Sequence, residues 1–308
     1  MLPFGKPDIK KLEEKGDVKG LIKALKYKRD AYVRWKAAKI LGKWKEKRAI
    51  KGLVELLYDS DWHVRRNAVE ALGNIGNKIC VKDVEKLLDD ENPYVRAEAA
   101  TALGKIKDIN SVEVLTRHLS DRHLEVKIRV IEAIGEIGDI RGLEPLIDVL
   151  KKGRDNRVEI FVGEALGKIG KNLVAKEALI SILKYTNYPN IKWAISKAFY
   201  DIKDKKVVDY LIKSLKEINP LVRAQTIATL GEIGDEKAFP YIVEALKDFA
   251  WEVRKEAAEA LIKMKNKEAI NPLKEALGKE TSDDVEATIR KAITYLSNLN
   301  VEQNKNRK

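Results

Sequence analysis

Apolar and polar residues follow a helical period along this chain, and the whole pattern returns every 31 to 33 residues. Each copy has a β-branched residue, usually followed by a cation, and then an alanine-rich run. Nine anchor pairs mark the copies: Val33-Arg34, Val64-Arg65, Val95-Arg96, Val126-Lys127, Val158-Glu159, Ile191-Lys192, Val222-Arg223, Val253-Arg254 and Val285-Glu286. A fixed period of this length predicts stacked units that bury their apolar faces against their neighbours.

The copy at residues 77–107 shows what one unit contains. Apolar residues at helical spacing predict a first helix that ends near residue 88. Asn92 is a good N-cap, and Pro93 suits the first position of a second helix, where a missing N–H is tolerated. Val95, Ala99, Leu103 and their neighbours then draw one apolar stripe. Each unit is therefore predicted to be a helix, a turn and a second helix.

Small residues recur on the predicted second helices. A glycine follows the large apolar residue of many copies, at Gly42, Gly73, Gly104, Gly135, Gly167 and Gly231. Each glycine costs about 1 kcal/mol relative to alanine inside a helix. A cost repeated in so many copies predicts close contact with a neighbouring helix. None of these glycines lies in a strand–loop–helix setting, so they do not indicate a phosphate-binding loop.

The cation after each anchor has two interpretations. Arg65 lies four residues after Asp61, so it can pair with the acid of its own turn or with that of the next unit. We favour a ladder of charges between repeats. Contact with a ligand is the alternative.

The run from Asp61 to Gly76 is similar to the short HEAT-type repeat named after the phycobilin lyases, as are residues 92–107, 219–234 and 248–263. The resemblance covers residues 17–297. It implies an all-α fold, a right-handed superhelical HEAT solenoid of nine helical hairpins whose second helices line a concave side. Residues 1–16 are expected to form a capping segment, and residues 298–308 a disordered polar tail. The family contains mostly interaction scaffolds and a few enzymes, so the fold indicates function only weakly.

Composition favours a cytoplasmic protein, which we expect to be monomeric. Cys80 is the only cysteine of the 308 residues, so an internal disulfide is impossible. The segment after Met1 lacks the apolar core of a signal peptide, and no apolar run reaches the roughly 20 residues needed to span a bilayer. Abundant Lys, Glu and Ile also suit a heat-loving source.

Candidate catalytic residues are scarce. His63, His118 and His123 have no metal-ligand spacing, and Cys80 has no histidine at a useful spacing in its own unit. The chain also lacks the His-Glu dipeptides with which a HEAT-type hydroxylase holds two irons. We therefore expect a non-enzymatic protein without metal or cofactor. Activities like those of a bilin lyase, a DNA glycosylase or a hydroxylase remain remote alternatives.

The predicted concave face is apolar near its centre. Positions taken as exposed there are Ile128, Ile160, Phe161 and Trp193, with charged residues toward both ends. The fifth and sixth copies, which contain the last three of these residues, depart most from the repeat pattern. An apolar centre with polar surroundings is typical of a site for a protein or peptide. Burial of these side chains by tight curvature is the alternative interpretation.

A second candidate surface is the basic N-terminal end. Residues 1–50 hold 16 Lys and Arg against 6 Asp and Glu. Cations and aromatic residues interleave there, which suits phosphates and exposed bases. The candidate residues for a nucleic acid or another polyanion are Trp35, Lys36, Lys39, Lys43 and Arg66. A charged cap that keeps the stack in solution would explain the lysines equally well.

Overall fold

The computed structural model describes residues 6–152 and 155–305, and it divides into two compact units, unit 1 (Met1–Val149) and unit 2 (Leu150–Lys308). Unit 1 contains α1 (Ile9–Glu14), α2 (Val18–Ala24), α3 (Ala31–Lys43), α4 (Ile50–Leu56), α5 (Trp62–Ile75), α6 (Val81–Lys86), α7 (Pro93–Ile106), α8 (Ser111–Arg117) and α9 (Leu124–Ile137). The division falls within α10 (Leu143–Lys152). Unit 2 continues with α11 (Asn156–Ile169), α12 (Leu173–Tyr185), α13 (Pro189–Ile202), α14 (Val208–Ser214), α15 (Pro220–Ile233), α16 (Phe239–Ala245), α17 (Trp251–Met264), α18 (Ile270–Leu277) and α19 (Asp283–Lys305).

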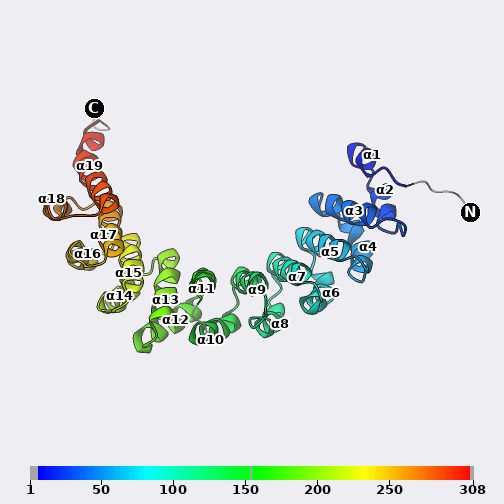
Figure 1. Ribbon diagram of the computed structural model, residues 1–308, viewed down its shortest axis with the longest axis horizontal. Coiled ribbons are helices and arrows are strands. Elements are labelled where there is room, and N and C mark those ends of the chain that lie inside the picture. Colours follow the sequence, from blue (N-terminus) through cyan, green and yellow to red (C-terminus); the bar gives the residue numbers. More distant parts are fainter. Residues whose placement is uncertain (1–5, 153–154, 306–308) are drawn as a thin grey trace, which may run out of the picture. The chain divides into compact units, whose positions relative to one another are not determined.

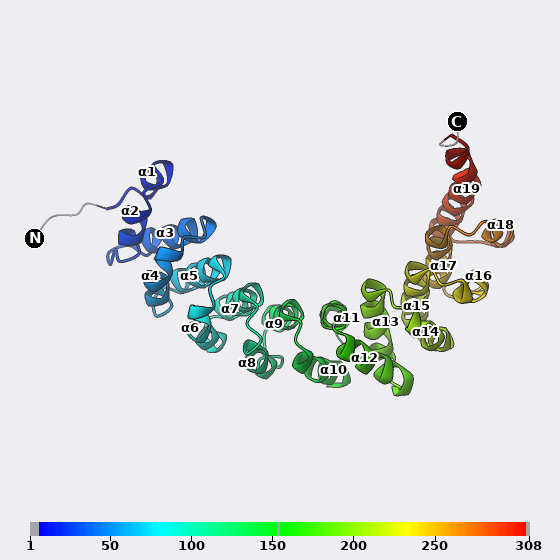
Figure 2. The ribbon, with the colours of Figure 1, turned by 180° about the vertical axis from the view of Figure 1, so that it is seen from behind.

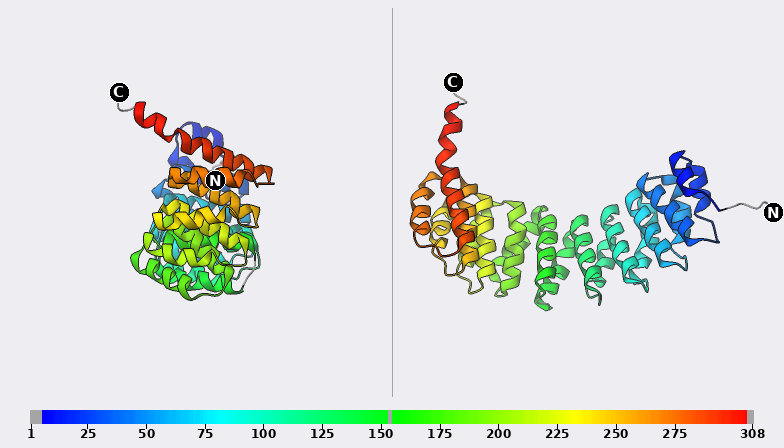
Figure 3. Two further views of the ribbon diagram at one scale, coloured as in Figure 1. Left: turned by 90° about the vertical axis from the view of Figure 1, so that its left-hand side faces the viewer. Right: turned by 45° about the horizontal axis from the view of Figure 1, so that its top comes forward.

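Within each unit the helices form two layers. The second helices of consecutive repeats pack side by side (Figures 1 and 2). They are α3, α5, α7 and α9 in unit 1, and α11, α13, α15, α17 and α19 in unit 2. The first helices pack behind them, and most contact the second helix of their own repeat, as α4 does with α5 and α16 with α17. Other views show the same layers (Figure 3). This arrangement confirms the predicted all-α solenoid of stacked helical hairpins.

Helix boundaries follow local sequence signals. The side chain of Asn92 accepts the backbone N–H of Tyr94 at 2.9 Å, and Pro93 occupies the first turn of α7. Asn219 and Pro220 begin α15 in the same way. Asp8 caps α1, the predicted capping helix. At the other end, α19 is helical through Lys305 because no proline or glycine interrupts it, so the predicted polar tail is helical as far as that residue. Residues 306–308 lie outside the described residues.

The repeated glycines mark where second helices meet. A Cβ added to Gly42 would lie 2.5 Å from the Cα atom of Ala71, and one added to Gly73 would lie 2.8 Å from the Cα atom of Ala102. Gly231 faces Ala260 in the same way. These distances are too short for real side-chain contacts, so only glycine allows the helices to approach this closely. The predicted close contact is confirmed at Gly42, Gly73 and Gly231.

Most of the anchor cations form the predicted ladder, and their partners lie in the next repeat. Arg65 donates two hydrogen bonds to the carboxylate of Asp90, at 2.7 and 2.9 Å. It also donates to the carbonyl of Asp59, which closes its own turn. Asp61 instead caps α5 by accepting the N–H of His63. Equivalent ion pairs join Arg34 to Asp59, Arg96 to Asp121, Lys192 to Glu217, Arg223 to Asp248 and Arg254 to Glu280.

Candidate functional site

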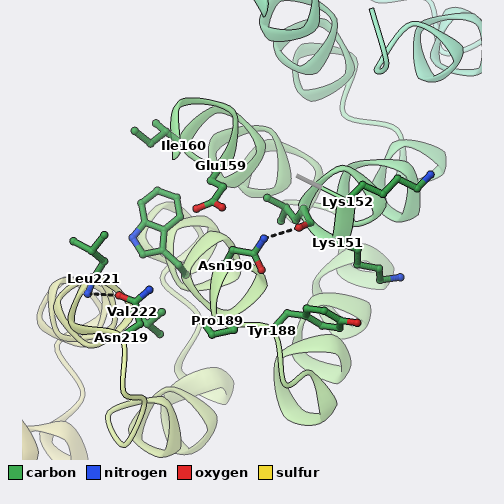
Figure 4. Close-up of a pocket in the computed structure, with 12 residues that line it drawn as sticks. Lys151, Lys152, Glu159, Ile160, Tyr188, Pro189, Asn190, Asn219, Leu221 and Val222 are labelled. Carbon is green, nitrogen blue, oxygen red and sulfur yellow. Dashed lines mark hydrogen bonds between the residues drawn. The ribbon is translucent and has the colours of Figure 1, made fainter. Parts of the chain in front are cut away.

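A cavity of about 710 Å³ opens on unit 2, where the fifth, sixth and seventh repeats meet. Its apolar lining comes from Ile160 of α11, Trp193 of α13 and Leu221 of α15. Two residues at the start of α13, Tyr188 and Asn190, also line the cavity. Ile160 is 42% exposed and Leu221 is 49% exposed. Figure 4 shows these two residues at one side of the cavity, on the two helices that flank α13. Large apolar side chains that are this open to solvent are available to a ligand.

The cavity coincides with a change in the charge ladder. Glu159 occupies the position that holds a cation in most repeats, and it directs its carboxylate toward the middle of the cavity (Figure 4). Asn190 of α13 donates its side-chain N–H to the carbonyl of Leu150, in the preceding repeat, at 2.5 Å. Burial raises the pKa of Glu159, and the opposing hydrogen bond from Asn190 does not cancel that effect. Without a long arginine side chain at this position, the space between the helices stays open.

A smaller cavity, of about 330 Å³, adjoins the first and shares Trp193 and Leu221 with it. Trp251, which is 44% exposed, also lines this smaller cavity. Gln225 of α15 and four charged residues of α17 complete its wall: Glu252, Lys255, Glu256 and Glu259. Burial, followed by repulsion from Glu259, raises the pKa of Glu256. The two cavities together are named the unit-2 groove below.

The predicted apolar residues do not all belong to this groove. Ile160 and Trp193 line it. Phe161 is half-buried, and it is absent from the lining of both cavities. Ile128, only 9% exposed, lies on α9 in unit 1. Packing therefore buries Ile128, as the alternative interpretation expected. Ile160 and Trp193 are instead accessible from the cavity.

Sequence reasoning missed the part of the groove formed by helix N-termini. Leu221 precedes its anchor valine by one residue, and Trp251 precedes its anchor by two. The predicted residues Ile128, Ile160 and Trp193 each lie two residues after their anchor, so the prediction did not reach the first turn of the second helices. Leucine and tryptophan in a helical first turn, where polar residues are common, were the available signal.

The predicted polyanion residues lie on α3 and α5 of unit 1. Lys39 and Lys43 are exposed, and Lys36 is half-buried beside Trp35. Among the described residues, none of these three lysines forms an ion pair. Arg66 differs, because its guanidinium contacts the carboxylate of Glu98 at 3.4 Å. The freely available positive charge of this face is thus concentrated on α3.

Aromatic rings gather at the start of three second helices in unit 1. Trp35 meets Tyr32 edge to face, with ring centroids 5.0 Å apart. Trp62 stacks on His63 at 3.7 Å and lies 5.6 Å from the nearly parallel ring of Tyr94. The repeat pattern does not indicate the Trp62 stack, because the stack is built from residues on two repeats. Such rings are suitable surfaces for stacking.

The described residues show little that could perform chemistry. No group of three or more His, Cys, Asp or Glu side chains is placed to hold a metal ion between residues 6 and 305, leaving out 153–154. Cys80 is buried, and burial raises the pKa of its thiol. Its sulfur donates to the carbonyl of Asn77. No helix in the described part of the chain combines the length and apolar character needed to cross a membrane.

Comparison with solved structures shows the same fold in part of a larger protein, Kap121p. Kap121p matches 91% of this chain at 12% identity with a TM-score of 0.64, and the matched part is 37% of Kap121p. Kap121p bound to Pho4p gives 13% identity and a TM-score of 0.65, over 90% of this chain and 37% of that one. The complex of CpcE and CpcF of phycocyanin lyase from Nostoc sp. PCC7120 matches at 20% identity with a TM-score of 0.46, over 91% of this chain and 94% of that one.

No curated protein sequence matches this chain. The sequence family described as HEAT repeats matches residues 18–89, 81–167 and 208–294. These segments cover most of the chain and both units. Together with the stacked hairpins, they show that the chain belongs to the HEAT-repeat family.

Proposed function

We propose that this protein is a non-enzymatic scaffold that binds a segment of another protein in the unit-2 groove. The observation that carries the proposal is the pair of adjoining cavities whose shared wall is Trp193 and Leu221. An apolar centre with a charged border is the usual anatomy of a protein-binding site. Tryptophan is also frequent among the residues that contribute most to binding energy.

The structural likeness to Kap121p is consistent with this proposal. Kap121p has been solved bound to the extreme C-terminus of the protein phosphatase Cdc14p. That protein shares the fold at only 12% identity. Its structure therefore supports the idea that such a fold can bind a segment of another protein, but it does not indicate which partner this chain binds. A stack of hairpins offers a continuous face along which a chain segment can lie.

Replacing Trp193 with alanine is expected to weaken partner capture by roughly 30-fold, because a central tryptophan commonly contributes about 2 kcal/mol or more. The measurement is quantitative affinity capture from native lysate, comparing wild type with Trp193→Ala and Ile160→Asp. Tyr241→Ala is the matched control, since Tyr241 is an exposed aromatic residue on α16 outside the groove. Thermal unfolding of each variant verifies that it is folded. Proteins that remain bound to both groove variants at wild-type levels contradict the proposal.

A second candidate function is polyanion binding through α3. It is favoured by Lys36, Lys39 and Lys43, which form no ion pair among the described residues and lie on the same helix as Trp35. Cations neutralise phosphates, and aromatic rings stack on unpaired bases. This candidate is secondary because α5 and α7 add the acids Glu70 and Glu98 to the same face.

If α3 binds nucleic acid, fluorescence anisotropy at low salt will detect binding of a single-stranded oligonucleotide. The double variant Lys36→Glu/Lys39→Glu should then lose at least about tenfold in affinity, since each phosphate contact adds to a salt-dependent attraction. Lys51→Glu/Lys78→Glu is the control, because both lysines are exposed in unit 1 but away from α3. Equal losses from the two double variants would reveal nonspecific attraction to a basic protein.

A further inference from the structure

The unit-2 groove has carboxylates at one end that form no direct ion pair among the described residues; Lys263 and Lys255 attract Glu256, but Lys263 bonds instead to Glu232. Glu252, Glu256 and Glu259 line the smaller cavity, and only Lys255 accompanies them there. None of these three acids forms an ion pair among the described residues. Three acids and one lysine leave this end of the groove negative.

Two carboxylates at equivalent places in other repeats are paired. Glu98, which corresponds to Glu256, contacts Arg66, and Glu132, which corresponds to Glu259, contacts Arg129 at 2.9 Å. In those repeats the face supplies its own cations. The eighth repeat lacks these pairs, although its two acids are partly buried beside apolar side chains. A partly desolvated carboxylate gains most from a partner that brings a positive charge.

Apolar side chains approach these acids from successive repeats. Trp193, Leu221 and Trp251 lie on α13, α15 and α17, and all three line the smaller cavity. Neighbouring helices pack about 8–10 Å apart. An extended segment in the polyproline II conformation returns to the same side every three residues, after roughly 9 Å. Side chains three residues apart can therefore meet successive repeats.

The wall of the groove also carries an amide that suits an extended ligand. Gln225 makes one long side-chain contact, 3.4 Å from its Nε2 atom to the hydroxyl of Thr229. It can therefore bond with the backbone of a ligand. Backbone N–H and C=O groups are free in an extended segment, whereas a helix uses them internally.

We propose that the unit-2 groove takes an extended segment of a partner protein with apolar residues three apart and a Lys or Arg at the end that reaches α17. The apolar side chains lie against Trp193, Leu221 and Trp251, and the cation lies between Glu256, Glu259 and the Trp251 ring. A cation held by carboxylates and the face of an indole gains from both. This inference rests on the proposed function, and it adds the chemistry of the ligand.

Selection from a phage library of random 12-residue peptides on the immobilised full-length protein tests this inference. Wild type is expected to enrich apolar residues at three-residue spacing, with Lys or Arg at one end at least about fivefold over Asp or Glu. On Glu256→Lys/Glu259→Lys, the charge preference should reverse. A synthetic peptide from the wild-type selection should bind that variant at least about tenfold more weakly. Glu236→Lys/Glu268→Lys is the matched control, since both acids are exposed outside the groove.

The outcomes separate this inference from the proposed function. Peptides that need Trp193 but show no charge preference, or that keep it on Glu256→Lys/Glu259→Lys, overturn the cationic ligand and leave the groove as a binding site. A seven-residue spacing of apolar positions overturns the extended conformation. Peptides that bind Trp193→Ala as tightly as wild type, or a library that yields nothing above the Trp193→Ala background, contradict the groove itself.

Discussion

Substituting alanine for Gly231 is expected to destabilise unit 2 by about 3 kcal/mol, despite the gain of about 1 kcal/mol in helix propensity. The added Cβ would lie 2.6 Å from the Cα atom of Ala260, so α15 and α17 would have to separate. Backbone atoms cannot rotate away as a flexible side chain can. Chemical denaturation followed by circular dichroism measures the change, with attention to separate transitions because repeat arrays need not unfold in two states.

Gly167 provides the matched control for this substitution. It occupies the equivalent position in the fifth repeat, but an added Cβ would meet its nearest atoms, in Ala198, at 3.4 Å. Gly167→Ala should therefore be neutral or slightly stabilising. The double variant Gly231→Ala/Ala260→Gly should recover part of the loss, because it removes one of the two clashing methyl groups. Equal stability of Gly231→Ala and Gly167→Ala would show that helix contact does not explain the glycines.

Removing the guanidinium of Arg96 is the second change with a large expected effect. Its side chain is buried, and it donates two hydrogen bonds to Asp121 of the next repeat, at 2.8 and 3.1 Å. Arg96→Ala leaves that carboxylate buried without its partner, which costs about 3–5 kcal/mol at neutral pH. Denaturation curves measure the loss. Arg122→Ala, at an exposed arginine nearby, should change stability by less than about 0.5 kcal/mol.

The cost of Arg96→Ala should shrink in acid. Burial alone would raise the pKa of Asp121, but hydrogen bonds from Arg96 and from the backbone N–H of His123 outweigh it and hold that pKa below its usual value. A carboxyl with a lowered pKa in the folded state contributes stability above its unfolded pKa of about 3.9 and loses it as pH falls through the folded pKa. The gap between wild type and variant should therefore be smaller at pH 3 than at pH 7. A gap that is independent of pH would assign the loss to packing.

The period of the sequence predicts the fold because each repeat contacts only its neighbours. An apolar stripe at helical spacing, Asn92 followed by Pro93, and a glycine facing Ala102 each have one local structural consequence, and all three agree. The sequence predicts that ion pairs join consecutive repeats. Its spacing alone could not decide whether Asp61 or Asp90 is the partner of Arg65. That choice depends on how closely consecutive turns approach, which a repeat pattern does not reveal.

The candidate site was predictable only in part. Ile160 and Trp193 stand out because hydrophobic residues replace the polar residues expected on an open helix face. Ile128 looks the same in sequence, yet neighbouring side chains cover it. Exposure of an apolar position depends on the size of its neighbours in adjacent repeats. The acids of α17 were visible in the sequence, but whether they find cations could be judged only from the packing of the side chains.

Glu159 departs from the repeat pattern at a position that lines the groove. Where arginine would fill the space between turns and bond to the next repeat, this residue ends at a short carboxylate beside Ile160 and Asn190. The repeat that departs from the pattern therefore gives up an inter-repeat ion pair and leaves a cavity. Departures from a structural rule are often found at functional sites.

Hydrogen–deuterium exchange of the full-length protein, with and without a captured partner or selected peptide, tests the central claim most directly. Binding in the unit-2 groove should slow amide exchange at the starts of α11, α13, α15 and α17, around Ile160, Trp193, Leu221 and Trp251, because the ligand suppresses local opening there. Exchange in α3, α5 and α7 should not change. Protection confined to unit 1, or to the first-helix layer of unit 2, would contradict the claim.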